Sequence, residues 1–331
     1  MRFVTSISAT TVLLNLMKVS NAFALAPKQH VIKRKIGLVR FITEPEFIAK
    51  YIIMIIIGVV AFSLLKSKKM NKKLKVSILL VSLILFGFMG NFFSWAGLQP
   101  SPVCAAVKPF LMGLRPPFLI FLSVIFALTL LGPKLFCGWV CPVGAFQELI
   151  SMISDRLGIK RWNFSFRLSN SIRAGILAAF FLLSVTAVLH TGTGDKTVPE
   201  SLYSYFNAFY GMNIDSQADL MEYIINYLPL ILTVILAVNL YRPYCHFICP
   251  IGLYTNILEH IAVFRVSLDE QKCNSCNLCV KRSPCKALPC ILKGSRFRAD
   301  CFICNRCLEE CGKEAFTVVA GDYFSDGCPG E

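Results

Sequence analysis

Five apolar runs, separated by charged connections, limit what this chain of 331 residues can fold into. Each is long enough, or nearly so, to cross a hydrocarbon core of about 30 Å as a helix. With 55% hydrophobic residues and a mean hydropathy of +0.61, the chain is too apolar for an ordinary soluble domain. We therefore predict an α-helical membrane protein with about five transmembrane helices. The predicted spans are residues 47–65, 76–93, 117–132, 174–189 and 224–240.

The charges between the runs predict the orientation of the chain. The connection 66–75 carries six lysines and 133–173 is also basic, whereas 191–223 is acidic. Because cytoplasmic loops carry an excess of Lys and Arg, the first two connections should be cytoplasmic and the third external. Everything after residue 241 is then cytoplasmic. One stretch does not fit the charge rule, because residues 28–40 are basic yet are placed on the external side. The net charge of +15 comes with no nucleic-acid-binding motif.

The first 46 residues form a separate N-terminal segment. Arg2 precedes a mildly apolar stretch, and NAFALA ends in the A-x-A pattern of a cleaved signal peptide. Lys18 and the Ser and Thr content weaken this prediction, so an uncleaved membrane-associated tail stays open as the alternative, as does an organellar targeting sequence. The predicted location is the cell (inner) membrane, as a multi-pass protein, and an organellar membrane is the alternative.

A repeat follows two of the predicted spans. KLFCGWVCPVGAFQELI at 134–150 aligns with RPYCHFICPIGLYTNIL at 242–258, at a constant offset of 108 (242 minus 134). Both preceding spans run from outside to inside, which predicts a parallel repeat about a pseudo-twofold axis along the membrane normal. Such an axis brings four motif cysteines to one cytoplasmic interface. They are Cys137, Cys141, Cys245 and Cys249.

Two interpretations of this CxxxCP pair stay open. Either the four thiolates share one iron–sulfur cluster, or each pair is a redox-active or metal-handling dithiol. Pro after the second Cys removes a backbone donor and Gly permits a close backbone approach, and both features suit a chain wrapped around a cluster. Static disulfides are disfavoured on a cytoplasmic face, where thiols are kept reduced.

The strongest metal signal lies near the C-terminus, where CFICNRCLEEC has the C-x2-C-x2-C-x3-C spacing of a two-cluster ferredoxin. Short x2 steps let three thiolates of one loop bind three irons of one cluster. Zinc, the alternative, prefers paired C-x2-C knuckles. The preceding CNSCNLCVKRSPCKALPC is less regular, because Ser283 stands where the pattern has its fourth Cys.

The usual crossing of ligands between the two loops predicts two [4Fe–4S] sites. Cluster 1 takes Cys273, Cys276, Cys279 and Cys311. Cluster 2 takes Cys301, Cys304, Cys307 and Cys285, with Cys290 as the alternative fourth ligand. A three-iron cluster, or Ser283 as an oxygen ligand, stays open as a further alternative. The predicted ferredoxin-like domain is a small α+β unit at 267–316, after a transmembrane domain at 47–266 and before a tail at 317–331.

FCGWVCPVG and YCHFICPIG, followed by a two-cluster ferredoxin, resemble the membrane polyferredoxin-like iron–sulfur proteins. That family includes the NapH-type quinol-oxidising subunit of periplasmic nitrate reduction, nitrous-oxide-reductase maturation regulators and cytochrome-oxidase assembly proteins. The resemblance covers about 110–316. It implies a helical membrane domain with a cytoplasmic ferredoxin, and electron transfer between quinone or quinol, clusters and other subunits of an oxidoreductase complex.

Two functions therefore stay open. One is a membrane electron-transfer subunit with two [4Fe–4S] clusters, a third cluster at the CxxxCP pair, and quinone as a further cofactor. The other is a metal-handling, copper-reducing or metalloenzyme-assembly factor, because thiolates select Cu(I). The iron, sulfide and copper content of the protein separates the two.

Overall fold

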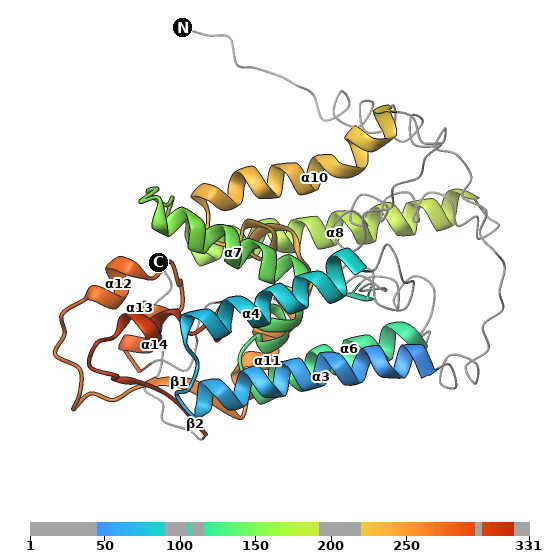
Figure 1. The fold of residues 1–331 in the computed structure, drawn as a ribbon. Coiled ribbons are helices and arrows are strands. Elements are labelled where there is room, and N and C mark those ends of the chain that lie inside the picture. Colours follow the sequence, from blue (N-terminus) through green and yellow to red (C-terminus); the bar gives the residue numbers. More distant parts are fainter. Residues whose placement is uncertain (1–44, 90–104, 107–115, 192–219, 295–299, 321–331) are drawn as a thin grey trace, which may run out of the picture.

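The computed structural model describes residues 45–89, 105–106, 116–191, 220–294 and 300–320 (Figure 1). The predicted N-terminal segment 1–46 lies almost wholly outside these residues. So do most of the acidic connection 191–223 and most of the tail 317–331.

Each of the five predicted apolar runs is helical, apart from at most its last residue or two, where the structure describes it, and the helices lie lengthwise beside one another in Figure 1. Branched aliphatic and aromatic residues dominate them, and Pro229 lies inside the last one. The five helices are α3 (Pro45–Lys66), α4 (Lys72–Leu83, continued by a π-helical turn at Ile84–Phe88), α6 (Pro116–Leu131), α8 (Phe166–Thr191) and α10 (Leu220–Asn239).

One helix of the described residues, Ile48–Lys66, is long and apolar enough to cross a membrane. Shorter apolar helices cover Phe118–Leu131 and Tyr227–Asn239. The arrangement with five spans stays a prediction.

Both CxxxCP motifs form a π-helical turn that leads into a short helix. The turn Phe136–Val140 precedes α7 (Pro142–Arg156), and the turn Tyr244–Ile248 precedes α11 (Ile251–Leu258). A 3-10 turn follows α11 at Glu259–Ile261. π-helical turns are rare and occur frequently at functional sites. Because both motifs contain one at equivalent positions, both are candidates for a functional site. α7 packs between α4 and α10 and buries a polar face against them.

The cysteine-rich C-terminal part forms a small unit with two antiparallel strands, β1 (Phe264–Leu268) and β2 (Phe316–Ala320). Phe264 pairs with Ala320 and Leu268 with Phe316, so the strands extend past the predicted boundaries at 267 and 316. Three one-turn helices complete the unit: α12 (Leu278–Arg282), α13 (Leu288–Leu292) and α14 (Arg306–Glu310). We call this part the ferredoxin unit.

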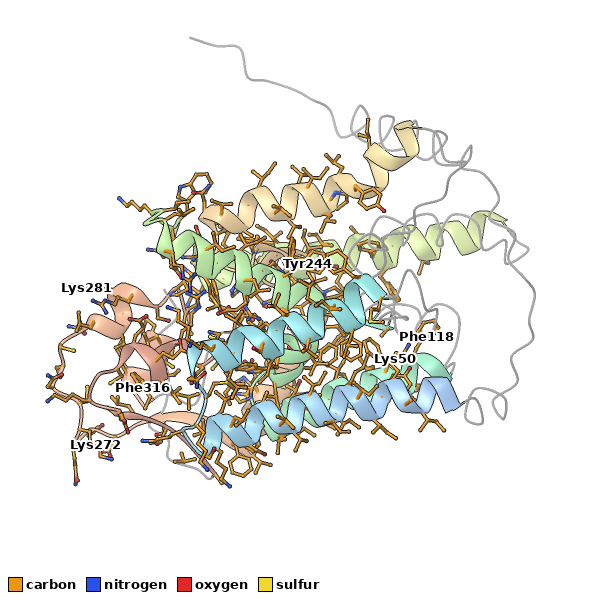
Figure 2. All side chains as sticks on the ribbon, in the orientation of Figure 1. Lys50, Phe118, Tyr244, Lys272, Lys281 and Phe316 are labelled. Carbon is orange, nitrogen blue, oxygen red and sulfur yellow. The ribbon has the colours of Figure 1, made fainter. Side chains whose placement is uncertain are left out.

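The ferredoxin unit lies at one end of the helices, next to the turn between α3 and α4 (Figures 1 and 2). One hydrophobic core runs through the helices into the unit, from Phe121 and Trp139 to Ile303 and Phe316. The unit is therefore packed against the helical part, which brings its cysteines close to the CxxxCP motifs.

Candidate metal centres

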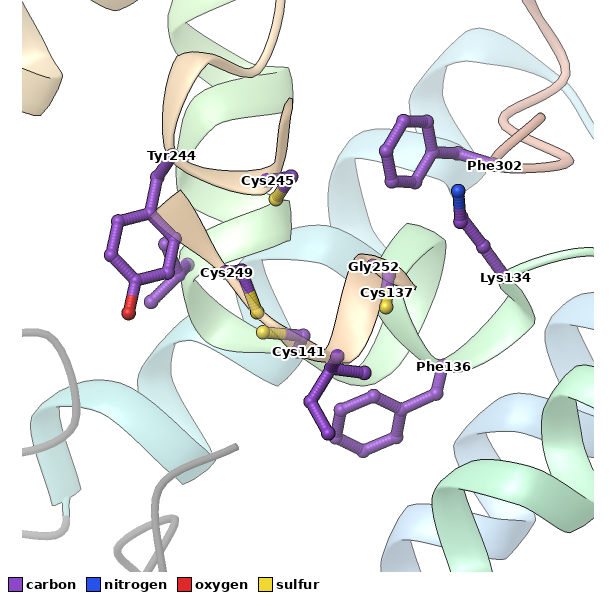
Figure 3. Close-up of a pocket in the computed structure, with 11 residues that line it drawn as sticks. Lys134, Phe136, Cys137, Cys141, Tyr244, Cys245, Cys249, Gly252 and Phe302 are labelled. Atoms are coloured by element: carbon purple, nitrogen blue, oxygen red, sulfur yellow. The ribbon is translucent and has the colours of Figure 1, made fainter. Parts of the chain in front are cut away.

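The four CxxxCP cysteines line one cavity, which Figure 3 shows with the sulfurs of Cys141 and Cys249 facing each other. We call Cys137, Cys141, Cys245 and Cys249 the paired-cysteine site. Most other lining residues are also equivalent pairs of the repeat, such as Phe136 with Tyr244. Only Phe302, from the ferredoxin unit, lies outside the two repeats.

Polar contacts between the repeats have the reciprocity of a twofold relation. Arg242 Nη2 lies 3.1 Å from Glu148 Oε2, and Lys134 Nζ donates a hydrogen bond to Asn256 Oδ1. Position 242 is equivalent to 134, and 256 to 148, so each basic residue reaches the same position of the other repeat. In a twofold arrangement residue i contacts j while j contacts i. Lys134 and Arg242 also share a left-handed backbone, with φ of 45° and 47°.

The thiols of the paired-cysteine site resist ionisation without a cation. Burial and the neighbouring thiols raise the pKa of Cys137 well above its usual value. Burial, followed by the charge of Cys245, raises the pKa of Cys249 to about 12. Because metal ligands must be thiolates, cluster or metal binding would have to release these protons.

Glu148 of α7 is the centre of one buried ionic network. Its carboxylate lies 2.9 Å from Lys75 Nζ, 3.1 Å from Arg242 Nη2 and 2.8 Å from Arg306 Nε. Burial acts to raise the pKa of Glu148, but these cations hold it well below the usual value. Arg306 belongs to the ferredoxin unit, so the network joins that unit to both repeats.

Asp300 is the centre of a second network. It forms ion pairs with Lys134 and, at 3.2 Å, with Arg173, and it is hydrogen-bonded to His246 Nδ1 at 3.1 Å. Burial acts to raise the pKa of Asp300, but Lys134 and His246 hold it well below its usual range. Arg173 Nη1 also donates to the Cys245 carbonyl oxygen at 3.0 Å.

Positive charge is in excess among the described residues around these networks. Burial raises the pKa of Glu259 to about 8, because its effect exceeds the opposing effect of the Lys134 charge. Burial also lowers the pKa of His246. Both side chains are therefore neutral at pH 7. The two buried carboxylates, Glu148 and Asp300, stay ionised. They face five buried cations, an excess of three buried charges (five minus two): Lys75, Lys134, Arg173, Arg242 and Arg306.

An uncompensated buried charge is expensive, so a neighbouring anionic group would stabilise this arrangement. Four thiolates around an iron–sulfur cluster are such a group. Arg173 Nε and His246 Nε2 are also buried without a hydrogen-bond partner among the described residues. The donor set and the charge around it therefore fit an iron–sulfur cluster.

The two cysteine loops of the ferredoxin unit share an unusual backbone. Ser275 and Asn277 have φ of 53° and 56°, and the equivalent Ile303 and Asn305 have φ of 44° and 70°. Alternating right- and left-handed residues turn successive N–H groups into a concave nest, which is a common setting for iron–sulfur sites. Both loops are therefore shaped to surround an anionic cluster.

The structure groups the ferredoxin cysteines into two sets. The charges of Cys301, Cys304 and Cys307 act on Cys285, whose pKa is raised well above its usual value first by burial and then by them. We call these four residues the inner site. The pKa of Cys279 is likewise raised, first by burial and then by the charges of Cys311 and Cys276. These three, with the partly exposed Cys273, are the outer site.

Two residues bear on the fourth ligand of the inner site. Cys290, the alternative, is buried in α13, whereas Cys285 lies within electrostatic reach of Cys301, Cys304 and Cys307. Ser283, which stands at the expected Cys position, accepts a hydrogen bond at 3.3 Å from the Cys285 N–H. This arrangement favours Cys285. No three His, Cys, Asp or Glu side chains of the described residues converge on a position for a single metal ion.

Sequence reasoning missed the residues that join the sites. The basic residue three positions before each motif was visible in the repeat, but its partners Glu148 and Asp300 were not. Phe302 carried no signal beyond its position next to Cys301, although it lines the cavity.

The family model described as "4Fe-4S binding domain" matches the chain twice, at residues 114–160 and 224–268. Each match contains one CxxxCP motif, and both end before the ferredoxin cysteines begin. The comparison therefore finds the repeat independently and associates it with iron–sulfur proteins.

Three similar proteins illustrate the relationship. An uncharacterized protein of Methanocaldococcus jannaschii is 23% identical over 65% of this chain and 76% of its own length. The ferredoxin-type proteins NapH of Escherichia coli and Haemophilus influenzae are 28% and 25% identical over 60% and 57% of this chain. The aligned regions span 66% and 63% of those two proteins, slightly under two thirds of their length. No solved structure matches the chain.

Proposed function

From the confirmed resemblance to the NapH-like membrane iron–sulfur proteins, we propose that this chain is a multi-pass membrane electron-transfer protein. The inner and outer sites each hold a [4Fe–4S] cluster, and the paired-cysteine site holds a third iron–sulfur cluster. Such clusters supply one-electron redox chemistry when bound. The observation that carries the proposal is the cavity lined by all four CxxxCP cysteines beside an excess of buried cations.

The surface of the helices supports insertion in a membrane. Exposed large aliphatic residues cover the outer sides of α3 and α10, where a soluble protein would place polar side chains. On these two helices they are Ile48, Ile52, Ile55, Ile56, Val59, Val60, Ile224, Leu228, Ile231, Leu232, Ile235 and Leu236. The basic connection 66–75 lies at the same end as the ferredoxin unit, as the proposed cytoplasmic orientation requires (Figure 1).

The burial of the sites supports an order for electron transfer. Residues 274–278 of the outer site are exposed, whereas Cys301, Cys304 and Cys307 of the inner site are buried beside the paired-cysteine site. The outer site is therefore accessible to another redox-complex subunit. The paired-cysteine site lies among the helices, on the side from which electrons would be exchanged with quinone or quinol.

Metal analysis of anaerobically purified full-length protein tests the proposal. Three [4Fe–4S] clusters correspond to about twelve irons per chain, and the two ferredoxin clusters alone to about eight. We expect about twelve in the wild type and about eight in Cys141→Ala/Cys249→Ala, with the ferredoxin signals intact. Met54→Leu, a volume-conserving change in the buried core of α3, controls for general damage and should retain about twelve.

About eight irons in both the wild type and the double variant would contradict a third cluster. Stoichiometric copper that disappears in the double variant would instead support the metal-handling alternative.

A further inference from the structure

Residues 300–306 of the ferredoxin unit form an unbroken buried run that contacts the helical part. All seven are buried, and they include Cys301 and Cys304 of the inner site. Asp300 at one end and Arg306 at the other pair with the two ionic networks of the repeats. We call residues 300–306 the docking segment.

Phe302 occupies the position between the inner site and the paired-cysteine site. It packs with Cys304 of the inner site and Cys245 of the paired-cysteine site in one small hydrophobic cluster, which Cys137 also contacts. It is the only cavity-lining residue that does not come from a repeat, and Figure 3 shows its ring beside Lys134 at the cavity. No other side chain of the ferredoxin unit reaches this cavity among the described residues.

The ring of Phe302 lies beside one cation of each repeat. The equivalent cations Lys134 and Arg242 lie 5.4 and 4.6 Å from its centroid. Both distances are in the range of cation–π attraction, which is stronger where water is excluded. Each repeat therefore contributes one cation to the surroundings of the ring.

The repeat departs from symmetry where the docking segment enters. Gly138 and His246 are the equivalent residues of the two motifs that differ most in size and polarity. A Cβ at Gly138 would lie 2.3 Å from the Phe302 carbonyl oxygen, so a larger residue is excluded there. His246 packs edge-on against the Phe302 ring, with centroids 5.5 Å apart, and pairs with Asp300.

The backbone of the docking segment is held in a strained conformation. Ile303 has φ of 44°, which is an outlier for a β-branched residue. Its carbonyl oxygen accepts a hydrogen bond from Trp139 Nε1 at 3.1 Å, and Trp139 is fully buried. Such strain persists where the surroundings over-determine the conformation.

We infer that the docking segment fixes the inner site against the paired-cysteine site, and that Phe302 is the positioning residue that sets the contact between them. This rests on the proposed function, because it assigns a structural relation between two of the proposed clusters. Phe302 ligates nothing. It excludes water from the contact and keeps the two sets of cysteines at a fixed separation.

Magnetic resonance of the full-length protein in nanodiscs tests this inference. When both clusters are reduced, close paramagnetic centres broaden each other's signals and speed each other's relaxation. We compare wild type with Phe302→Leu, Phe302→Ala and Phe316→Leu, and measure iron per chain for each. Phe316 is also a buried phenylalanine of the ferredoxin unit, but it lies in β2 and does not line the cavity.

In Phe302→Ala we expect full iron content and loss of the mutual broadening. Phe302→Leu should weaken the broadening and Phe316→Leu should leave it unchanged. Reduction of the paired-cysteine cluster after the inner cluster is reduced should also be slower in Phe302→Ala than in the wild type, because electron transfer slows as two centres move apart. If Phe302→Ala loses iron, Phe302→Leu alone decides the result.

Wild-type broadening in the iron-replete Phe302 variants would overturn the inference while leaving the proposed function intact. A wild type that lacks any signal from a third cluster would contradict the proposed function itself. The two failures are therefore distinguishable in one set of samples.

Discussion

The two cysteine loops of the ferredoxin unit have the same local backbone and opposite surroundings. Both place left-handed residues at equivalent positions, Ser275 and Asn277 in one loop and Ile303 and Asn305 in the other. Yet residues 274–278 are exposed, whereas all of 301–307 is buried. The outer loop carries small polar residues at the left-handed positions, which suits solvent. The inner loop carries a strained isoleucine that packs into the core.

This difference shows which property each level of structure controls. The spacing of the cysteines and the turn chemistry shape a nest for a cluster in either loop. The surroundings set solvent access and nearby charge, and these tune the reduction potential of a cluster. Two loops built alike are therefore expected to hold clusters with different potentials and different partners.

Removing one ligand from each loop should have the largest effect. Cys304→Ala should lose about four irons from the inner site. It should also loosen the docking segment, because Cys304 packs against Phe302 and Tyr241. Cys276→Ala, in the exposed loop, should lose the outer cluster alone. The iron content of each purified variant measures the loss of a cluster, and the thermal midpoint measures the loss of stability. Equal loss of stability in the two variants would show that burial does not distinguish the loops.

Neutralising Asp300 should have the next largest effect. Asp300→Asn leaves Lys134 and Arg173 buried without their anionic partner, and breaking a buried ion pair typically costs about 3–5 kcal/mol. The matched control is Asp269→Asn, which affects a partly exposed pair with Lys272 and should change stability by less than about 0.5 kcal/mol. Thermal unfolding in detergent provides the comparison. A small effect of Asp300→Asn would mean that the cations are compensated by other groups.

A methyl group at Gly138 should separate docking from general stability. In Gly138→Ala the new Cβ meets the Phe302 backbone, which cannot yield as a flexible side chain would, so we expect a loss of about 1–3 kcal/mol. Gly175→Ala, in α8, has no neighbouring atoms within 4 Å and should be neutral or stabilising by up to about 1 kcal/mol. Limited proteolysis should also cut the ferredoxin unit faster in Gly138→Ala. Identical digestion of the two variants would argue against a tight contact at Gly138.

Much of this arrangement could be predicted from local sequence. The five apolar runs predicted helices, and a helix covers nearly all of each run where the structure describes it. The repeat predicted that Cys137 and Cys245 would come together, because equivalent elements of a repeat tend to be related by symmetry. The x2 spacings predicted two cysteine loops because ligand spacing within a loop is local.

The contacts between the parts could not be predicted in this way. Glu148 and Asp300 are separated by more than 150 positions (300 minus 148), and each is identified as a network centre only by residues brought together in the fold. Likewise, nothing in the spacing of the inner loop distinguishes it from the outer one. Which loop faces the helices depends on packing of the whole ferredoxin unit, and this is a property of tertiary structure.

The last expected effect is a pH dependence that belongs to the surroundings of the inner site alone. Glu259 lies 3.4 Å from Lys134, the cation that pairs with Asp300, and burial raises its pKa from 4.5 to about 8. Between these values the folded protein keeps a proton that the unfolded chain releases. Stability should therefore fall as pH rises through this window, because the folded state binds more protons than the unfolded state.

Glu259→Gln should remove this part of the pH dependence, since an amide does not titrate and keeps nearly the same shape. The exposed Glu314, which pairs loosely with Lys68 at 3.7 Å, is the control, and Glu314→Gln should leave the slope unchanged. Thermal midpoints measured from below pH 4.5 to above pH 8 give the slope for all three proteins. An unchanged slope in Glu259→Gln would mean that the Glu259 carboxyl is ionised in the folded state. In that case Lys134 would share its charge between two carboxylates, and the excess of buried positive charge would fall from three to two.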